Sequence, residues 1–193
     1  FGVALDVGTT TIAAHLCDLS TGKVLASGGI MNPQIRFGED LMSRVAYIMM
    51  NPNSSDLITK IVRSGINKLI KQLRLKTGIE KDKIIDSVIV CNPIMHHLLL
   101  GINPTELGMS PFALATNKSV LITAKKLSIT EMNVGAKTYI LPCIAGHVGA
   151  DCAAVLLSET PHLSKEMTLI IDVGTNAEII LGNKNGLFAA SAP

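Results

Sequence analysis

Apolar and polar positions along the chain follow two different periods, and each period predicts one kind of element. Short apolar, β-rich runs predict strands over residues 1–6, 10–18 and 24–30, with turn residues at 20–23. From residue 57 to 73, apolar residues recur every three or four positions while lysines fall on the other side. This spacing predicts a helix over 54–77, with an N-cap among residues 54–56 and an end at Gly78.

The rest of the chain mixes strand runs with helices. Strands are predicted over 87–91, 120–124 and 138–143, and helices over 39–50, 92–100 and 147–158. After residue 160 the opening pattern begins again, with strands over 167–172, 176–181 and 186–190 and a hairpin turn at 183–186. The sequence therefore predicts an α/β fold, a mixed sheet flanked by helices.

Composition narrows the class of protein. The chain is 48% hydrophobic with a mean hydropathy of +0.41, which suits central strands covered on both faces. Its net charge of +2 gives no sign of a nucleic-acid or membrane surface, and no apolar stretch approaches ~18 residues. The four cysteines are scattered without a C-x-x-C pair, so we expect neither an iron–sulfur site nor disulfides. Reduced, mostly buried thiols predict a cytoplasmic protein.

One short motif occurs twice, each time between a strand and a β-rich run. The two copies are Leu5-Asp6-Val7-Gly8-Thr9-Thr10 and, 166 positions further on, Ile171-Asp172-Val173-Gly174-Thr175-Asn176. A single echo at this long period indicates two duplicated lobes rather than a solenoid. Each copy alone could be an ordinary tight turn, but two copies in one context favour a shared chemical role.

The residue types in these turns suit a phosphate and its metal. An aspartate at the end of a strand offers a hard oxygen ligand for Mg²⁺, usually through water. A glycine lets the backbone approach a phosphate, and threonine and asparagine add donors. Two such turns facing each other would clamp a triphosphate, whereas P-loop and dinucleotide fingerprints are absent.

The paired turns resemble the phosphate-binding motifs of the ASKHA superfamily of acetate and sugar kinases, heat-shock chaperones and actin. Three further stretches resemble the ATP-dependent reductive activators of corrinoid proteins, the RACo-like family. These stretches are Asn32-Pro33-Gln34 with Phe37-Gly38-Glu39-Asp40-Leu41-Met42-Ser43-Arg44, then Cys91-Asn92-Pro93-Ile94-Met95-His96-His97, and Pro142-Cys143-Ile144-Ala145-Gly146-His147-Val148-Gly149-Ala150-Asp151. With the two turns they span almost the whole chain.

The resemblance implies an ATPase that returns a Co(II) corrinoid protein to Co(I). It implies ATP and Mg²⁺ as ligands, a corrinoid protein as partner, a possible homodimer, and an iron–sulfur cluster in a separate domain of the parent protein. It also implies a first ASKHA lobe over residues 1–163 and the start of a second over 164–193, with the adenosine-binding segment lying beyond. The catalytic candidates are Asp6, Asp151 and Asp172, of which Asp6 and Asp172 would hold Mg²⁺-bound water. The phosphate-binding candidates are Gly8, Thr9, Thr10, Thr11, Gly174, Thr175 and Asn176.

Several interpretations stay open at this point. Asp151 either orients the attacking water or occupies the first turn of a helix. A small-molecule kinase and a non-catalytic scaffolding module are the alternative functions.

For most of the other notable side chains, a structural role is the favoured interpretation. His96 and His97 are expected to be structural, and His147 is the better cleft candidate. Arg44 has the spacing for a helical pair with Asp40, and residues 48–50 are expected to pack in the core.

Overall fold

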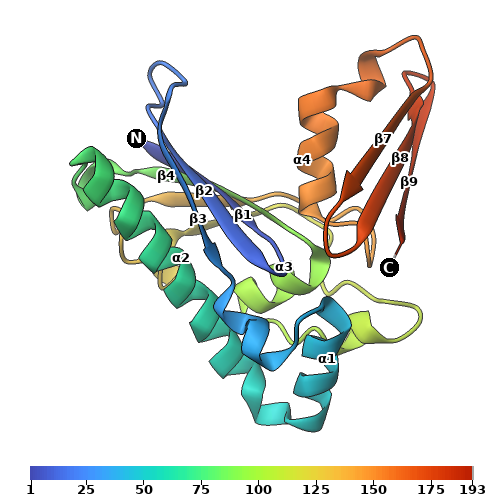
Figure 1. Ribbon diagram of the computed structural model, residues 1–193, viewed down its shortest axis with the longest axis horizontal. Helices are drawn as coiled ribbons and strands as arrows, with labels where there is room; N and C mark the ends of the chain where they lie inside the picture. The colour runs from blue at the N-terminus through green and yellow to red at the C-terminus, as the bar shows by residue number, and fades with distance from the viewer. Residues whose placement is uncertain (193) are drawn as a thin grey trace.

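The computed structural model describes residues 1–192, which form two β-sheets and four α-helices (Figure 1). The strands are β1 (Gly2–Val7), β2 (Thr11–Cys17), β3 (Val24–Met31), β4 (Asp86–Cys91), β5 (Val120–Thr123), β6 (Lys137–Ile140), β7 (Thr168–Val173), β8 (Ala177–Asn183) and β9 (Gly186–Ala192). The helices are α1 (Leu41–Met50), α2 (Ser55–Thr77), α3 (Pro93–Leu100) and α4 (Ala150–Glu159). Within these residues no helix has both the length and the apolar character needed to cross a bilayer.

The larger sheet has six strands in the order β3-β2-β1-β4-β6-β5. The three central strands β1, β4 and β6 run parallel, and the outer pairs are antiparallel. This mixed sheet, with helices packed against it, confirms the predicted α/β class. The parallel centre also explains the topology, because each parallel step requires a crossover, and α2 supplies the first one between β3 and β4.

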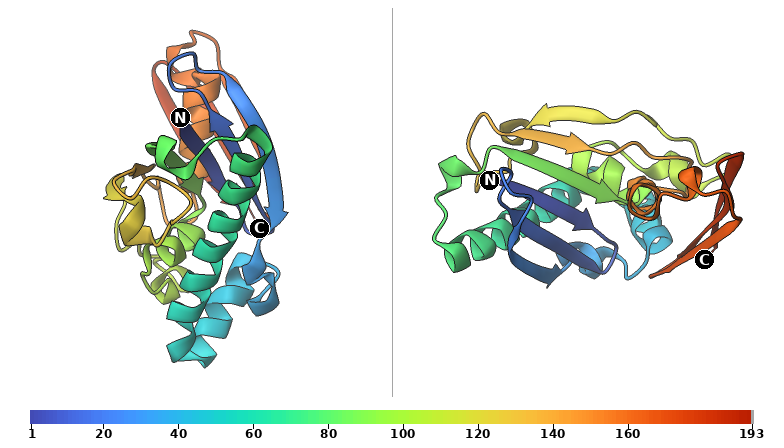
Figure 2. Two further views of the ribbon diagram at one scale, coloured as in Figure 1. Left: turned by 90° about the vertical axis from the view of Figure 1, so that its left-hand side faces the viewer. Right: turned by 90° about the horizontal axis from the view of Figure 1, so that it is seen from above.

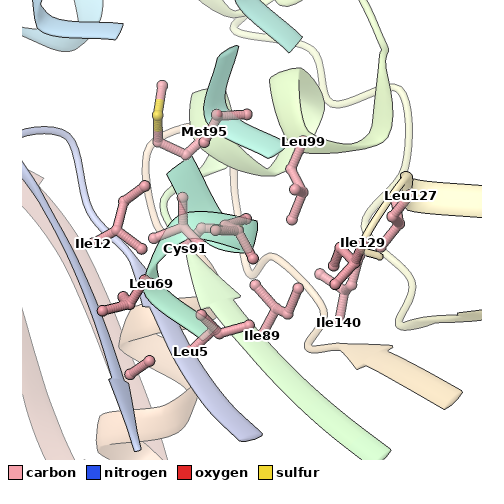
Figure 3. Packing of buried hydrophobic residues seen from close by; sticks show 14 of the residues in the cluster. Leu5, Ile12, Leu69, Ile89, Cys91, Met95, Leu99, Leu127, Ile129 and Ile140 are labelled. Carbon is pink, nitrogen blue, oxygen red and sulfur yellow. The ribbon is translucent and has the colours of Figure 1, made fainter. Parts of the chain in front are cut away.

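The main core lies between this sheet and the helices α2 and α3 (Figure 3). Along β1, alternate side chains Val3, Leu5 and Val7 are buried, while Ala4 and Asp6 point to the opposite face. The buried stripe of α2 follows the predicted three- and four-residue spacing and includes Ile66 and Leu69. Burial of each such aliphatic side chain stabilises the fold by about 1.5–3 kcal/mol. The same alternation that builds the core therefore leaves Asp6 free to serve another purpose.

Two local expectations from the sequence are wrong, and a third, the N-cap of α2, is confirmed in position only. Ser54 stands at the N-cap of α2, but its side chain caps nothing, because a 3₁₀ turn over Pro52–Ser54 leaves its backbone helical rather than extended. In the run 48–50 only Ile48 is buried, since successive helical residues point in different directions. Arg44 does not pair with Asp40, whose carboxylate instead caps α1 by accepting from the N–H and hydroxyl of Ser43.

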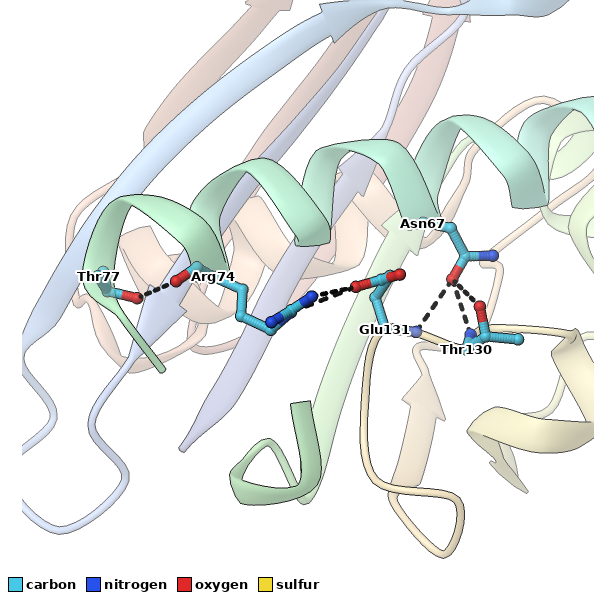
Figure 4. A network of polar contacts seen from close by, with 5 residues as sticks. All are labelled: Asn67, Arg74, Thr77, Thr130 and Glu131. Atoms are coloured by element: carbon cyan, nitrogen blue, oxygen red, sulfur yellow. Dashed lines mark hydrogen bonds and ion pairs between the residues drawn. The ribbon is translucent and has the colours of Figure 1, made fainter. Parts of the chain in front are cut away.

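A polar network joins the outer side of α2 to the segment before β6 (Figure 4). Arg74 and Glu131 form an ion pair at 2.9 Å, and both side chains are about one-fifth exposed. Asn67 Oδ1 accepts from the N–H groups of Thr130 and Glu131. An ion pair of this exposure contributes only about 0.2–1 kcal/mol, so the network fixes the position of the loop more than it stabilises the fold.

The second sheet is the antiparallel meander β7-β8-β9 with the predicted hairpin turn between Asn183 and Gly186. Helix α4 lies between the two sheets (Figures 1 and 2), and its Cys152 packs with Val148 and Ile180. The helix begins at Ala150, three residues later than predicted, because Ala145 and Val148 first close a tight turn. The position of α4 next to both sheets brings its N-terminus close to β4 and β8.

The paired histidines lie inside the core. His97 accepts at Nε2 from the Ala115 N–H and makes its other hydrogen bond, 2.8 Å, from Nδ1 to the Pro93 carbonyl, which defines a neutral ring. His96 is fully buried, and neither of its ring nitrogens has a hydrogen-bond partner among the described residues. Burial, with a smaller effect from His97, lowers the pKa of His96 to about 4.

This burial predicts a loss of stability in mild acid. Since the unfolded chain binds a proton at His96 near pH 6.5 and the folded chain only near 4, stability falls as pH falls through this window. We expect His96 alone to cost roughly 2 kcal/mol at pH 5 relative to pH 8. His96→Leu should remove that part of the pH dependence in denaturant unfolding, and the exposed control His162→Leu should not. Equal pH dependence in wild type and His96→Leu would contradict this reasoning.

Candidate nucleotide-binding site

Two turns of similar build stand at the ends of β1 and β7. In the first, the Gly8 N–H donates to the Thr11 carbonyl at 3.0 Å, and in the second the Gly174 N–H donates to the Asn176 carbonyl at 2.9 Å. A Cβ on Gly8 would lie 2.8 Å from the Thr11 oxygen, so only glycine fits there. The second turn is one residue shorter, which makes Asn176 the counterpart of Thr11 rather than of Thr10.

The two turns meet across a cavity. The hydroxyls of Thr10 and Thr175 lie 3.1 Å apart and form a direct contact between the two sheets. The cavity has a volume of about 380 Å³ and contains every site residue predicted from the sequence together with two others. Its lining consists of Asp6, Gly8, Thr9, Thr10, Thr11, Asn92, Asp151, Asp172, Gly174, Thr175, Asn176 and Glu178.

Asp151 reaches the cavity from the first turn of α4. Two residues earlier, the backbone of Gly149 packs closely against the end of β4. A Cβ at this position would lie only 2.7 Å from the Cys91 carbonyl oxygen. Because Gly149 has no side chain, the N-terminus of α4 packs directly against β4. The Asp151 side chain therefore lies in the same cavity as the phosphate turn at the end of β1. The Asp151 carboxylate also accepts from the Cys152 N–H at 2.8 Å. The two interpretations of Asp151 are thus compatible, because it occupies a helical first turn and lines the cavity.

Four carboxylates share the cavity, those of Asp6, Asp151, Asp172 and Glu178, and the pKa of three of them is raised, first by burial and then by neighbouring carboxylates. Burial raises the pKa of Asp151 to about 6, against the hydrogen bond from Cys152. Burial, followed by Asp151 and Asp172, raises the pKa of Glu178 to about 7. Burial and then Asp172 also raise the pKa of Asp6. A cavity with this much clustered negative charge favours a cation.

The donor set fits a magnesium ion that is shared with phosphate and water. Among residues 1–192, no three side chains converge closely enough to hold a metal ion by themselves. Mg²⁺ commonly keeps several waters and takes one or two carboxylates plus phosphate oxygens. Asp6 and Asp172, at the ends of facing strands, supply carboxylates of this kind. The four cysteines are free thiols, and Cys91, Cys143 and Cys152 are buried.

The sequence reasoning missed Glu178 and Asn92. Glu178 pairs with Asp172 in the register of β7 and β8, and its carboxylate accepts from the Asn176 amide. The signal was a single carboxylate within the apolar run of β8, where the first unit has Ala13 at the corresponding position. Asn92 caps α3 by accepting from the Met95 N–H, and donates to the Thr9 hydroxyl at 3.1 Å.

His147 lies beside this site rather than in it. Its ring packs edge-on against Phe112, with ring centroids 4.5 Å apart. Both residues line a neighbouring cavity of about 510 Å³, which shares Thr175 and Asn176 with the first. His147 is thus nearer to the site than the core residues His96 and His97, but it is not part of the cavity lining.

A mixed six-stranded sheet, a second sheet that opens with the same hairpin, and two turns facing each other across a carboxylate-lined cavity define an ASKHA-type nucleotide-binding fold. Comparison with known proteins identifies the branch. Residues 1–164 match the family described as the RACo middle region, and residues 166–193 match the C-terminal ASKHA domain of RACo. The chain belongs to the RACo family.

Its relatives are corrinoid activators. It is 35% identical over 191 residues to the corrinoid activation enzyme RamQ of Eubacterium limosum, covering 99% of this chain and 32% of that protein. A [Co(II) methylated amine-specific corrinoid protein] reductase of Methanosarcina barkeri is 24% identical, covering 100% of this chain and 36% of that protein. A solved structure of a reductive activator for corrinoid, iron-sulfur protein superimposes with a TM-score of 0.95 at 40% sequence identity. The match covers 98% of this chain and 30% of that one. The chain thus spans about a third of each relative.

Proposed function

We propose that this chain is the nucleotide-binding part of an ATP-dependent reductive activator, which returns a Co(II) corrinoid protein to Co(I). The observation that carries the proposal is the contact between Thr10 and Thr175, which joins the two turns over one cavity. The activators named among the relatives support the same reaction. A small-molecule kinase is less well supported, because the three proteins compared above are all described as corrinoid activators or reductases.

In this proposal the cavity binds ATP with Mg²⁺. Backbone N–H groups and hydroxyls of the two turns hold the phosphates, at Gly8, Thr9, Thr10 and Thr11 on one side and at Gly174, Thr175 and Asn176 on the other. Asp6 and Asp172 hold water molecules bound to the metal. The metal neutralises phosphate charge when bound, and the turns fix the phosphate groups in place, which is the main source of catalysis in phosphoryl transfer.

Asp151 orients the attacking water in this proposal. It comes from the start of α4, which lies between the two sheets, and its half-buried carboxylate lines the cavity together with the first phosphate turn. A carboxylate that accepts a hydrogen bond from water aligns the lone pair of that water with the phosphorus atom. The water must approach from the side opposite the leaving group, and a residue between the two lobes is suitably placed for this.

The partner and the electron come from outside these residues. We infer that a corrinoid protein binds the activator and that the electron arrives from an iron–sulfur cluster in another part of the protein, because no three cysteines gather at one place among residues 1–192. We further propose a homodimer in the cytoplasm, and that residues 1–163 make up the first lobe while 164–193 begin the second. The separation of the six-stranded and three-stranded sheets supports this division.

The proposal predicts that the corrinoid protein changes the rate of ATP hydrolysis. The complete protein should hydrolyse ATP faster when an oxidised corrinoid protein is added, because binding the partner couples hydrolysis to reduction. Asp151→Asn should lower the stimulated rate by about 10²- to 10⁴-fold with ATP affinity preserved. The matched control is Glu159→Gln at the exposed end of the same helix. Hydrolysis that ignores the corrinoid protein would count against the proposed function and favour a kinase or an independent ATPase.

A further inference from the structure

Two of the three family-like stretches outside the phosphate turns, residues 32–44 and 91–97, meet at one buried side chain, Arg44 on α1. Arg44 is completely buried, yet it forms no ion pair, since the single salt bridge among residues 1–192 joins Arg74 and Glu131. Its guanidinium donates to the carbonyls of Gly38 and Thr9, to Gln34 Oε1 at 3.3 Å and to Met95 Sδ at 3.2 Å. A buried cation without an acidic partner is costly, so its position calls for an explanation.

In the first phosphate turn, the carbonyl groups of Gly8, Thr9 and Thr10 all accept hydrogen bonds from the side of Asn32 and Arg44. The Gly8 carbonyl accepts from Asn32 Nδ2 at 2.8 Å, the Thr9 carbonyl from Arg44, and the Thr10 carbonyl from the Asn32 N–H at 2.7 Å. Asn92 also holds the Thr9 hydroxyl. Asn32 and Arg44 therefore fix the backbone of this turn, and Asn92 fixes the Thr9 side chain.

The orientation of the N–H groups follows from the planarity of the peptide bond. In a trans peptide the carbonyl of one residue and the N–H of the next point in opposite directions. Because Asn32 and Arg44 hold the Gly8 and Thr9 carbonyls inward, the N–H groups of Thr9 and Thr10 point outward. Neither N–H donates to any residue among 1–192. Free N–H groups in a turn are the usual cradle for an anion.

The charge of Arg44 acts in the same direction. Burial lowers its pKa to about 10, so the guanidinium stays protonated at neutral pH. Asp40, the acid that raises this pKa, is already engaged as the cap of α1. The positive charge consequently lies behind the Thr9 peptide, with no carboxylate within ion-pair distance to neutralise it.

We propose that Arg44 is the positioning residue of the first phosphate turn, holding the Thr9 peptide so that its N–H groups bind phosphate and supplying a buried counter-charge for the ligand. This inference rests on the proposed nucleotide site. It gives a physical role to the stretches 32–34, 37–44 and 91–97, which otherwise stand outside the phosphate chemistry. Asn32, Asn92 and Met95 support the arginine in this role.

The test compares Arg44→Met with Arg63→Met in the complete protein. Arg63 is the matched control, because it too donates to a backbone carbonyl, but that carbonyl belongs to Leu99 in α3 and not to the phosphate turn. Titration calorimetry with ATP, tripolyphosphate and adenosine separates phosphate recognition from binding of the base, and thermal unfolding without ligand reports the structural cost of each change.

We expect Arg44→Met to weaken binding of ATP and of tripolyphosphate by roughly 10- to 100-fold, the range for loss of a hydrogen bond to a charged group. Adenosine binding should change by less than about 2-fold, because adenosine carries no charge for the turn or the arginine to bind. Arg63→Met should lower the unfolding temperature without changing the affinity for either phosphate ligand.

Arg44→Lys keeps the charge and one donor, so it should recover part of the affinity, and it serves as the readout if Arg44→Met does not fold. Phosphate binding at wild-type strength in either variant, or equal losses for ATP and adenosine, would overturn the inference. If the wild type binds neither ATP nor tripolyphosphate, the inference falls together with the phosphate site. A wild type that binds ATP without reducing a corrinoid protein removes only the proposed function.

Discussion

Replacing Asp172 or Asp6 by asparagine is expected to reduce Mg²⁺-dependent ATP hydrolysis by about 10²- to 10³-fold while leaving the fold intact. Each carboxylate faces the cavity from the end of a strand, and neither supports the core. Loss of one electrostatic contact to the metal and its phosphates has an effect of this size in other active sites. The double variant should be little worse than either single one, because the two residues act on one metal.

The stability of these variants should move in the opposite direction to their activity. Burial and, to a smaller extent, the neighbouring carboxylates raise the pKa of Asp151 and of Glu178, so negative charge in the unliganded cavity is unfavourable. Removing one charge should therefore maintain or raise the unfolding temperature of the unliganded protein.

A carboxylate outside the cavity provides the matched control for this pair. Asp86 is an exposed carboxylate at the start of β4, outside the cavity. Asp86→Asn should change neither the rate of ATP hydrolysis nor the unfolding temperature. Hydrolysis at wild-type rates in Asp172→Asn would remove the metal role of that residue.

The residues that gather at the candidate site could be predicted from the sequence because they belong to short, local patterns. Asp6 and Asp172 each end an apolar strand, and the same three residues, Val-Gly-Thr, follow both. A strand followed by a turn places its last side chain at a defined edge of the sheet. Two copies of the motif then predict two facing turns, and every predicted residue lines the cavity.

The features that were missed depend on contacts between distant segments. The helical spacing of Asp40 and Arg44 predicts a local pair, but Arg44 instead finds carbonyl and amide groups from residues 9, 34 and 38. Glu178 lies in a strand that reads as apolar, and only its register against Asp172 brings it to the site. The shorter second turn likewise shifts Asn176 by one position relative to the first turn. Sequence spacing gives no access to these long-range arrangements.

The central claim is that nucleotide turnover at this cavity drives reduction of a corrinoid protein. Returning cobalt from Co(II) to Co(I) requires one electron from a low-potential donor. In the proposed mechanism, the binding and hydrolysis of ATP supply the free energy that makes this transfer favourable. Without ATP, the same donor should leave most of the cobalt as Co(II).

The most direct measurement follows Co(I) by its absorbance in an anaerobic mixture of the complete protein, a Co(II) corrinoid protein and a low-potential reductant. We predict that Co(I) accumulates after ATP and Mg²⁺ are added, and that Asp172→Asn forms it at least about 10²-fold more slowly. Asp86→Asn should behave as the wild type. Co(I) formation that is equally fast without ATP, or hydrolysis that proceeds without any Co(I), would contradict the account.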